Sequence, residues 1–140
     1  MEKLQAALRA GVGVLAFVIL STNATVHAME PPPASEEHEL RDNCDRPVPP
    51  PPLDGATATQ AQLDAAHDAV DDFMHASDHY QSCIRRYIGG REDMQRMTAS
   101  VLPPWMYRLA QEKIDANQKD KVAVGQAYND AVKAYHDKHP

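Results

Sequence analysis

The sequence is poor in the residues that build a large hydrophobic core. Among 140 residues there are only two Phe and one Trp, so any core is small. Glycine is also scarce, with six residues. Basic residues are outnumbered, 14 against 20 acidic ones, which gives a formal net charge of −6. A chain of this length forms one domain at most, which excludes a multidomain enzyme. The deficit of positive charge argues against nucleic-acid binding, since a protein that binds nucleic acid needs a basic surface to neutralise phosphates.

The sequence also lacks the motifs of the common enzyme classes. It contains no glycine-rich phosphate loop after a strand and no Gly-x-Ser-x-Gly elbow, and no nucleophile–base pair can be named. No segment alternates apolar and polar residues with a period of two, so no sheet is predicted. We therefore expect an all-α protein that is not an enzyme and uses no cofactor.

The first 28 residues have the pattern of an export signal. Lys3 and Arg9 supply positive charge, residues 10–20 carry no charge, and Ala28 precedes the expected cleavage site. An uncleaved signal that anchors the chain in a membrane is the alternative, but residues 10–20 form a stretch shorter than the ~20 residues that cross a bilayer. We expect the mature chain, residues 29–140, to be periplasmic or secreted, with no stable membrane span.

Cys44 and Cys83 are the only cysteines. An exported chain with two cysteines usually joins them, so we expect an intrachain disulfide, with a reactive thiol or an intermolecular bridge as the alternatives. Residues 29–56 hold eight of the eleven prolines and form an acidic arm that we expect to be partly disordered. We interpret the run Pro49–Pro52 as a stiff spacer, and the alternative is a docking ligand for an aromatic groove.

Residues 57–140 are expected to form an antiparallel helical hairpin with a short insert. Asp54-Gly55 is a turn signal, and Thr59 with Gln62 fits a capping box at the start of a first helix that Gly89-Gly90 should end. Residues 91–102 are ambiguous between a short amphipathic helix and turns.

A second helix is expected to begin at Pro103-Pro104, since proline is accepted in the first turn of a helix. Asn117 and Lys121 are polar members in the middle of its apolar stripe, which favours a kink or break there. Two copies of the hairpin could pair as a coiled-coil-like bundle, so we expect a homodimer or a partner protein of the cell envelope.

The arm and the first helix have comparable expected lengths. From Cys44 to Thr59 an extended arm reaches roughly 45 Å, and from Thr59 to Cys83 a helix reaches roughly 36 Å. The arm could therefore lie antiparallel along the first helix, with the disulfide at its far end. Cys83 falls nearly opposite the apolar stripe, beside Tyr87, which predicts an arm packed on the outer face of that helix.

Asp71, His75 and His79 recur at four-residue spacing on the polar side of the first helix. That spacing places neighbouring side chains ~5–6 Å apart, and two imidazoles with a carboxylate are suitable ligands for Zn²⁺ or Cu²⁺. A metal-binding protein is therefore the alternative hypothesis for function. A solvated acidic helix face explains the same residues.

A candidate interaction surface lies on the second helix, and its members are the large side chains Trp105, Met106, Tyr128 and Tyr135. Trp105 and Tyr107 are expected to pack on the first helix, with an exposed aromatic anchor for a partner or a membrane interface as the alternative. Methionine at helical spacing usually fills a core, which is the role expected of Met94, Met97 and Met106.

Three blocks of the sequence resemble a group of small, uncharacterised exported proteins of proteobacteria. The blocks are Cys44-x-x-Pro47-x-Pro49 with Leu53-Asp54-Gly55-Ala56-Thr57-Ala58-Thr59, then Val70-x-x-Phe73 with Ser77-Asp78-His79-Tyr80-Gln81-Ser82-Cys83, and last the block from Asn117 through Gly125-Gln126-Ala127-Tyr128-Asn129-Asp130-Ala131-Val132-x-Ala134-Tyr135. The resemblance implies an exported helical protein and supplies no activity or catalytic residue. The double proline before Trp105 departs from the pattern. Residues and resemblance together predict an exported structural or protein-interaction module.

Overall fold

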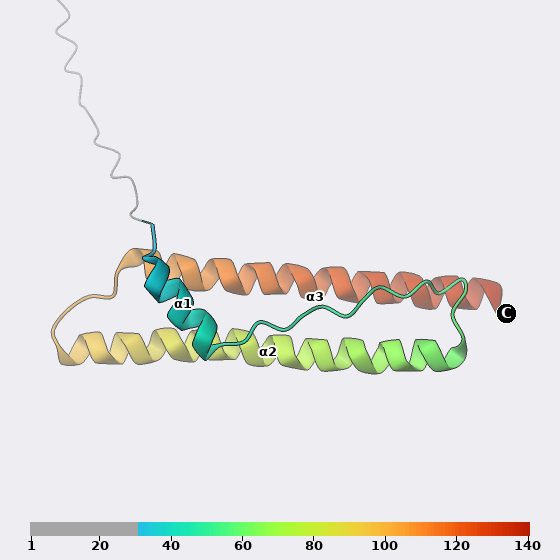
Figure 1. Ribbon diagram of the computed structural model, residues 1–140, viewed down its shortest axis with the longest axis horizontal. Helices are drawn as coiled ribbons and strands as arrows, with labels where there is room; N and C mark the ends of the chain where they lie inside the picture. Colours follow the sequence, from blue (N-terminus) through green and yellow to red (C-terminus); the bar gives the residue numbers. More distant parts are fainter. Residues whose placement is uncertain (1–30) are drawn as a thin grey trace, which may run out of the picture.

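The computed structural model describes residues 31–140, and the predicted export signal lies outside this range. Three helices and no strand occur in the described chain: α1 (Ala34–Asn43), α2 (Gln60–Met97) and α3 (Pro104–Lys138). The two long helices, α2 and α3, pack antiparallel (Figure 1). The predicted all-α hairpin is therefore confirmed. We call the end where residues 98–103 join the long helices the loop end, and the opposite end the terminal end.

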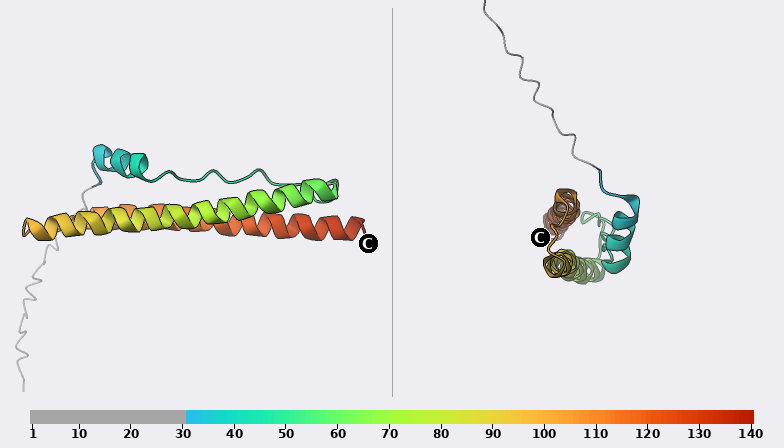
Figure 2. Two further views of the ribbon diagram at one scale, coloured as in Figure 1. Left: turned by 90° about the horizontal axis from the view of Figure 1, so that it is seen from below. Right: turned by 90° about the vertical axis from the view of Figure 1, so that its left-hand side faces the viewer.

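The segment between α1 and α2, residues 45–58, is called the strap. From the end of α1 it runs back toward the terminal end, antiparallel to α2 (Figure 1). Helix α1 and the strap lie on the same side of the hairpin, which we call the front face (Figure 2). The expected antiparallel course of the arm is thus what the structure has.

The strap lies over the groove between α2 and α3, and the expected position on the outer face of α2 is wrong. Arg46 of the strap contacts Asp120 of α3 at 2.6 Å, while Cys83 of α2 is half-buried against the core. One side of the strap faces the two long helices. Every third residue from the end of α1 onward is buried or half-buried, namely Cys44, Pro47, Pro50 and Leu53. Three residues per turn is the repeat of a polyproline helix, so one side of the strap packs on both helices at once.

The predicted disulfide is present. Cys44 and Cys83 are bonded with an S–S distance of 2.05 Å and a Cα–Cα distance of 5.8 Å. The bond fixes the last residue before the strap to the side of α2.

Helix α1 occupies part of the arm that was expected to be partly disordered. Glu36 and Glu37 lie in its first turn and Arg41 in its last, which complements the helix dipole at both ends. A helix of ten residues is marginal alone. Its tertiary contacts hold it in place, since Lys113 of α3 contacts Glu37 at 2.6 Å and Leu40 is buried.

Helix α2 begins where the capping box predicts. The Gln62 amide donates to Thr59 Oγ1 at 3.3 Å, and the Thr59 amide donates to Gln62 Oε1 at 2.8 Å. The predicted stop at Gly89-Gly90 is wrong, because α2 continues to Met97.

Contacts beyond the glycine pair explain why α2 continues. Arg91 binds Glu36 of α1 at 2.5 Å, and Glu92 accepts a hydrogen bond from Tyr107 of α3 at 2.7 Å. These contacts to both neighbouring helices outweigh the ~1 kcal/mol by which each glycine disfavours a helix. The helix ends instead before Ala99, which adopts a φ of 52°.

The densest core lies at the loop end. Tyr80 and Ile84 of α2, Met106 and Leu109 of α3, and Leu40 of α1 belong to one buried cluster. All three helices meet there, so this end anchors the fold.

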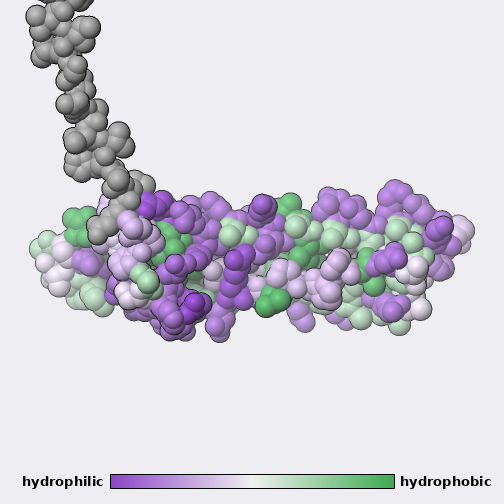
Figure 3. All heavy atoms as spheres, turned by 45° about the horizontal axis from the view of Figure 1, so that its top comes forward, coloured by the Kyte–Doolittle hydropathy of each residue, from purple (hydrophilic) through white to green (hydrophobic). Residues whose placement is uncertain are grey.

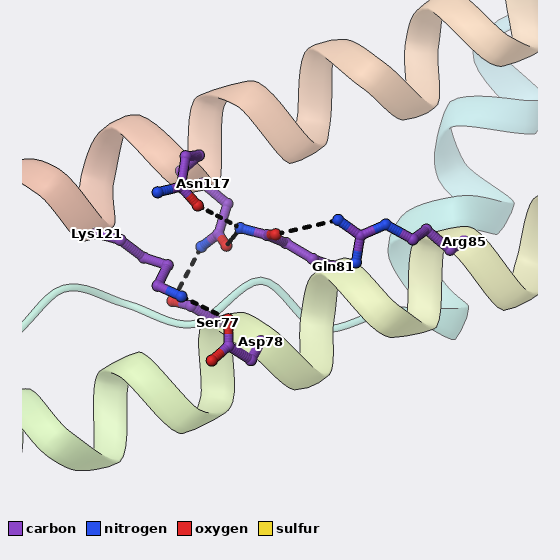
Figure 4. Close-up of polar contacts among 7 residues, drawn as sticks. Ser77, Asp78, Gln81, Arg85, Asn117 and Lys121 are labelled. Atoms are coloured by element: carbon purple, nitrogen blue, oxygen red, sulfur yellow. Dashed lines mark hydrogen bonds and ion pairs between the residues drawn. The ribbon is translucent and has the colours of Figure 1, made fainter.

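A buried polar layer lies between this core and the terminal half of the hairpin (Figure 4). The Gln81 amide donates to Asn117 Oδ1 at 3.0 Å, and Asn117 Nδ2 donates to Ser77 Oγ at 3.1 Å. Beside them, Lys121 pairs with Asp78 at 2.5 Å. The expected break in the second helix at Asn117 and Lys121 is wrong: α3 is continuous, because these side chains are paired across the hairpin.

Candidate functional site

An apolar groove lies on the front face of the hairpin. Its volume is about 420 Å³, and it lies between residues 50–53 of the strap and both long helices. From α2 it is lined by Ala65, Ala69 and Val70, and from α3 by residues that include Ala127 and Tyr128. Every residue that lines it is apolar or aromatic, so it offers no charge to a ligand.

The groove exists because side chains at the terminal end are small. At the loop end Ile84 and Leu109 fill the space between α2 and α3, whereas Ala69 and Ala127 leave it open. Leu53 of the strap is only half-buried over the gap. The same helix pair therefore forms a packed core at one end and an open groove at the other.

The groove lies between two fixed contacts. Toward the loop end lies the polar layer around Asn117. Toward the terminal end, Gly55 is buried against the backbone of Ala131, and an added Cβ at Gly55 would lie 1.8 Å from the Ala131 carbonyl oxygen. The predicted turn at Asp54-Gly55 forms there, with the Ala56 amide donating to Asp54 Oδ1 at 3.1 Å.

The four residues of the predicted interaction surface are not on one surface. Tyr128 lines the groove, where its ring contacts His67 with a centroid distance of 5.8 Å. Trp105 packs against the core cluster, and Met106 is only 4% exposed. The core-filling role expected of Met106 is therefore what the structure has, and Met106 does not contribute to an exposed surface. Tyr135 lies near the end of α3.

A second exposed apolar feature lies at the loop end, and sequence reasoning misassigned it. Met94, Met97 and Val101, which we call the tip, are 53%, 81% and 87% exposed. Core filling was expected for the two methionines, but α2 projects beyond the first turn of α3 and its last residues have no helix beside them (Figures 1 and 2). Figure 3 shows hydrophobic surface at this end of the molecule.

The geometry does not support the metal-binding alternative. His75 Nε2 lies 3.5 Å from Asp71 Oδ2, and both side chains are well exposed. In residues 31–140 no group of three or more His, Cys, Asp or Glu side chains, His79 included, is arranged to hold a metal ion. Consecutive positions four apart on a straight helix face do not converge on one point, which is why the spacing alone is weak evidence.

Two of the perturbed pKa values belong to groups that attach α1 to the hairpin. Burial raises the pKa of Tyr87 to about 12, and the carboxylates of Glu39 and Glu36 add to the rise against the opposing effect of Arg91. A hydrogen bond from Lys113 lowers the pKa of Glu37. None of these groups lines the apolar groove.

No family model, curated protein or solved structure matches this chain. The resemblance to small exported proteins of proteobacteria therefore stays a prediction. Among the described helices, none is both long and apolar enough to cross a membrane. The intrachain disulfide is consistent with an oxidising compartment outside the cytoplasm.

Proposed function

We propose that this chain is exported to the periplasm or secreted, and acts there as a small protein-interaction module that binds its partner through the tip. The observation that carries the proposal is the exposure of Met94, Met97 and Val101 together at the loop end. Clustered exposed apolar side chains mark interaction sites more often than scattered ones do. Fully burying a Val or Met side chain contributes ~1.5–3 kcal/mol, so the tip offers substantial binding energy.

The body beneath the tip supports this role. Leu102 and Met106, which follow the tip in sequence, are buried in the core cluster, and the disulfide Cys44–Cys83 belongs to the same region. A rigid base reduces the ordering that binding requires. Methionine adapts its shape to a partner, which suits it to a contact surface.

The partner is either a second copy of the chain or another protein of the envelope. Light scattering on the mature chain distinguishes the two, since a dimer of the purified protein assigns the tip to self-association. A homodimer must then become a monomer when Met97→Asp and Val101→Asp are combined.

A photo-crosslinking amino acid placed at position 97 in producing cells tests for another protein. We expect a discrete adduct from position 97, and its loss when Val101→Asp is added. Val48 supplies the matched control, because it is a valine 85% exposed against 87% for Val101, but it lies on the strap. Equal adducts from positions 48 and 97, or a monomer with no adduct at position 97, would refute the tip as a binding surface.

Export is tested separately. Mass spectrometry of the protein recovered from the periplasm or medium should give a chain that begins at Met29. Recovery of the chain only from the cytoplasm, with residues 1–28 retained, would contradict export and leave the binding test unaffected.

A further inference from the structure

We infer that the groove on the front face is a binding site for a compact, uncharged aromatic molecule. The site is separate from the tip, since it is formed by the strap and the terminal halves of α2 and α3. It therefore does not depend on the proposed protein interaction.

The volume and length of the groove point to a ring system. Its volume of about 420 Å³ lies within the ~300–1,000 Å³ that is usual for small-molecule sites. It is bounded by four strap residues and by six-residue stretches of each helix, which gives a length of roughly 10 Å at 1.5 Å per helical residue and 3.1 Å per polyproline residue. A groove this short for its volume is wider than one extended hydrocarbon chain needs.

The lining selects for an uncharged aromatic group. Pro51 and Pro52 present apolar rings on one wall, and Tyr128 presents an aromatic ring on another. Aromatic pairs prefer offset or edge-to-face packing, which contributes ~0.5–1.5 kcal/mol beyond the burial of area. The ring of Tyr128 packs against the ring of His67, with a distance of 5.8 Å between the ring centroids. The Tyr128 hydroxyl is the one side-chain hydrogen-bonding group among the lining residues.

Water is a poor occupant of this space. At ~30 Å³ per molecule the groove holds about 14 waters, and the apolar walls offer them almost no hydrogen bonds. Displacing poorly bonded water with an apolar ring is favourable.

The groove is also preformed. The strap is fixed at one end by the disulfide and by the contact of Arg46 with Asp120, and at the other by the approach of Gly55 to Ala131. A wall that is already ordered adds little conformational entropy loss to binding.

Fluorescence titration of the mature chain with N-phenyl-1-naphthylamine, an uncharged aromatic probe, tests the inference. We expect saturable binding that 1-naphthol displaces at least tenfold better than 1-decanol, which has the same number of carbons and one hydroxyl but no ring. 1-Naphthoic acid should compete less well than 1-naphthol, because no lining residue is cationic.

Variants locate the bound probe. Ala69→Phe fills the groove from α2, and Ala127→Phe fills it from α3. We expect each to weaken probe binding at least tenfold, while Ala61→Phe, at an exposed alanine of α2 outside the groove, leaves it unchanged. Circular dichroism checks that each variant is folded, and the combined Met97→Asp and Val101→Asp variant should bind the probe like the wild type.

Four outcomes would overturn the inference. The first three are no saturable binding to the wild-type chain, unchanged binding in a folded Ala69→Phe or Ala127→Phe variant, and displacement by 1-decanol as strong as by 1-naphthol. Loss of binding in the tip variant would instead place the probe at the tip and also overturn the site.

Discussion

Replacing Gly55 by alanine tests whether the strap is seated on α3 as the structure has it. A Cβ at Gly55 would lie 1.8 Å from the Ala131 carbonyl oxygen and 2.6 Å from its carbonyl carbon. Both are backbone atoms of a continuous helix, so neither can rotate away. The strap must therefore move off α3 at the terminal end.

The sign of the change in stability caused by Gly→Ala distinguishes Gly55 from a glycine whose surroundings have room for a methyl group. Where the added methyl is tolerated, Gly→Ala stabilises a protein by ~0.4–1 kcal/mol, because the unfolded chain loses conformational freedom. Overpacking at Gly55 should reverse that sign and cost about 1–3 kcal/mol. For a folded part of this size the melting temperature should fall by roughly 4–12 °C.

Two other glycines of the chain provide the control. At Gly89 and Gly90, in the interior of α2, an added Cβ meets nothing within 4 Å. The same substitution there should stabilise the helix by ~0.5–1 kcal/mol and raise the melting temperature by roughly 2–4 °C.

Thermal denaturation followed by circular dichroism at 222 nm measures all three variants. A Gly55→Ala protein that melts at or above the wild-type temperature would show that the close approach to Ala131 is absent. The seating of the strap, and with it the wall of the groove, would then have to be abandoned.

Three further perturbations have defined outcomes. Replacing both Cys44 and Cys83 by serine opens a loop of 39 residues. The loss should cost about 4 kcal/mol by the loop-entropy relation and lower the melting temperature by about 15 °C. An unchanged melting temperature in the double variant would show that the disulfide does not stabilise the fold. Asn117→Ala removes the donor to the buried Ser77 hydroxyl and one of the two acceptors of the Gln81 amide. It should cost ~1–3 kcal/mol in urea denaturation, whereas an increase in stability would contradict the polar layer. The difference in absorbance at 295 nm between the wild-type chain and Tyr87→Phe should show Tyr87 ionising at about pH 12 rather than 10. The fold favours the neutral form of Tyr87. The contribution of this group to the free energy of unfolding is therefore complete below pH 10 and falls as pH rises from about 10 to about 12.

The sequence predicted those elements that depend on local signals. The capping box at Thr59 and the proline start of α3 are set by residues within one helical turn of the boundary, and both were located correctly. The Cys44–Cys83 bond followed from cysteine number and expected compartment. The antiparallel course of the strap was predicted from the similar expected lengths of the extended arm and of the first helix.

The elements that the sequence did not predict depend on contacts between distant segments. Helix α1 has no strong apolar stripe and buries Leu40 alone, so periodicity could not find it, although its charged ends carried a weak signal. The continuation of α2 past Gly89-Gly90 depends on Arg91 contacting Glu36, 55 residues away. The groove could not be inferred either, because alanine stripes look the same whether a neighbouring segment covers them or not.

The polar layer links the register of the hairpin to the shape of the groove. A slip of α3 by one turn along α2 would place the Asn117 amide against Phe73 or Ile84, both buried and apolar. Each unpaired buried amide or hydroxyl then costs ~1–3 kcal/mol. The pairing of Asn117 with Ser77 and Gln81 thus favours one alignment.

That alignment has consequences at the terminal end. Only in this register do the alanines of α2 and α3 face each other across the groove, and only then does Ala131 stand where Gly55 can approach it. Asn117, a polar residue within the apolar stripe of α3, therefore fixes the position of every contact that shapes the groove. Because the layer acts on register, Asn117→Leu should loosen the groove even if it preserves helix content, since leucine would pair equally well with apolar residues one turn away.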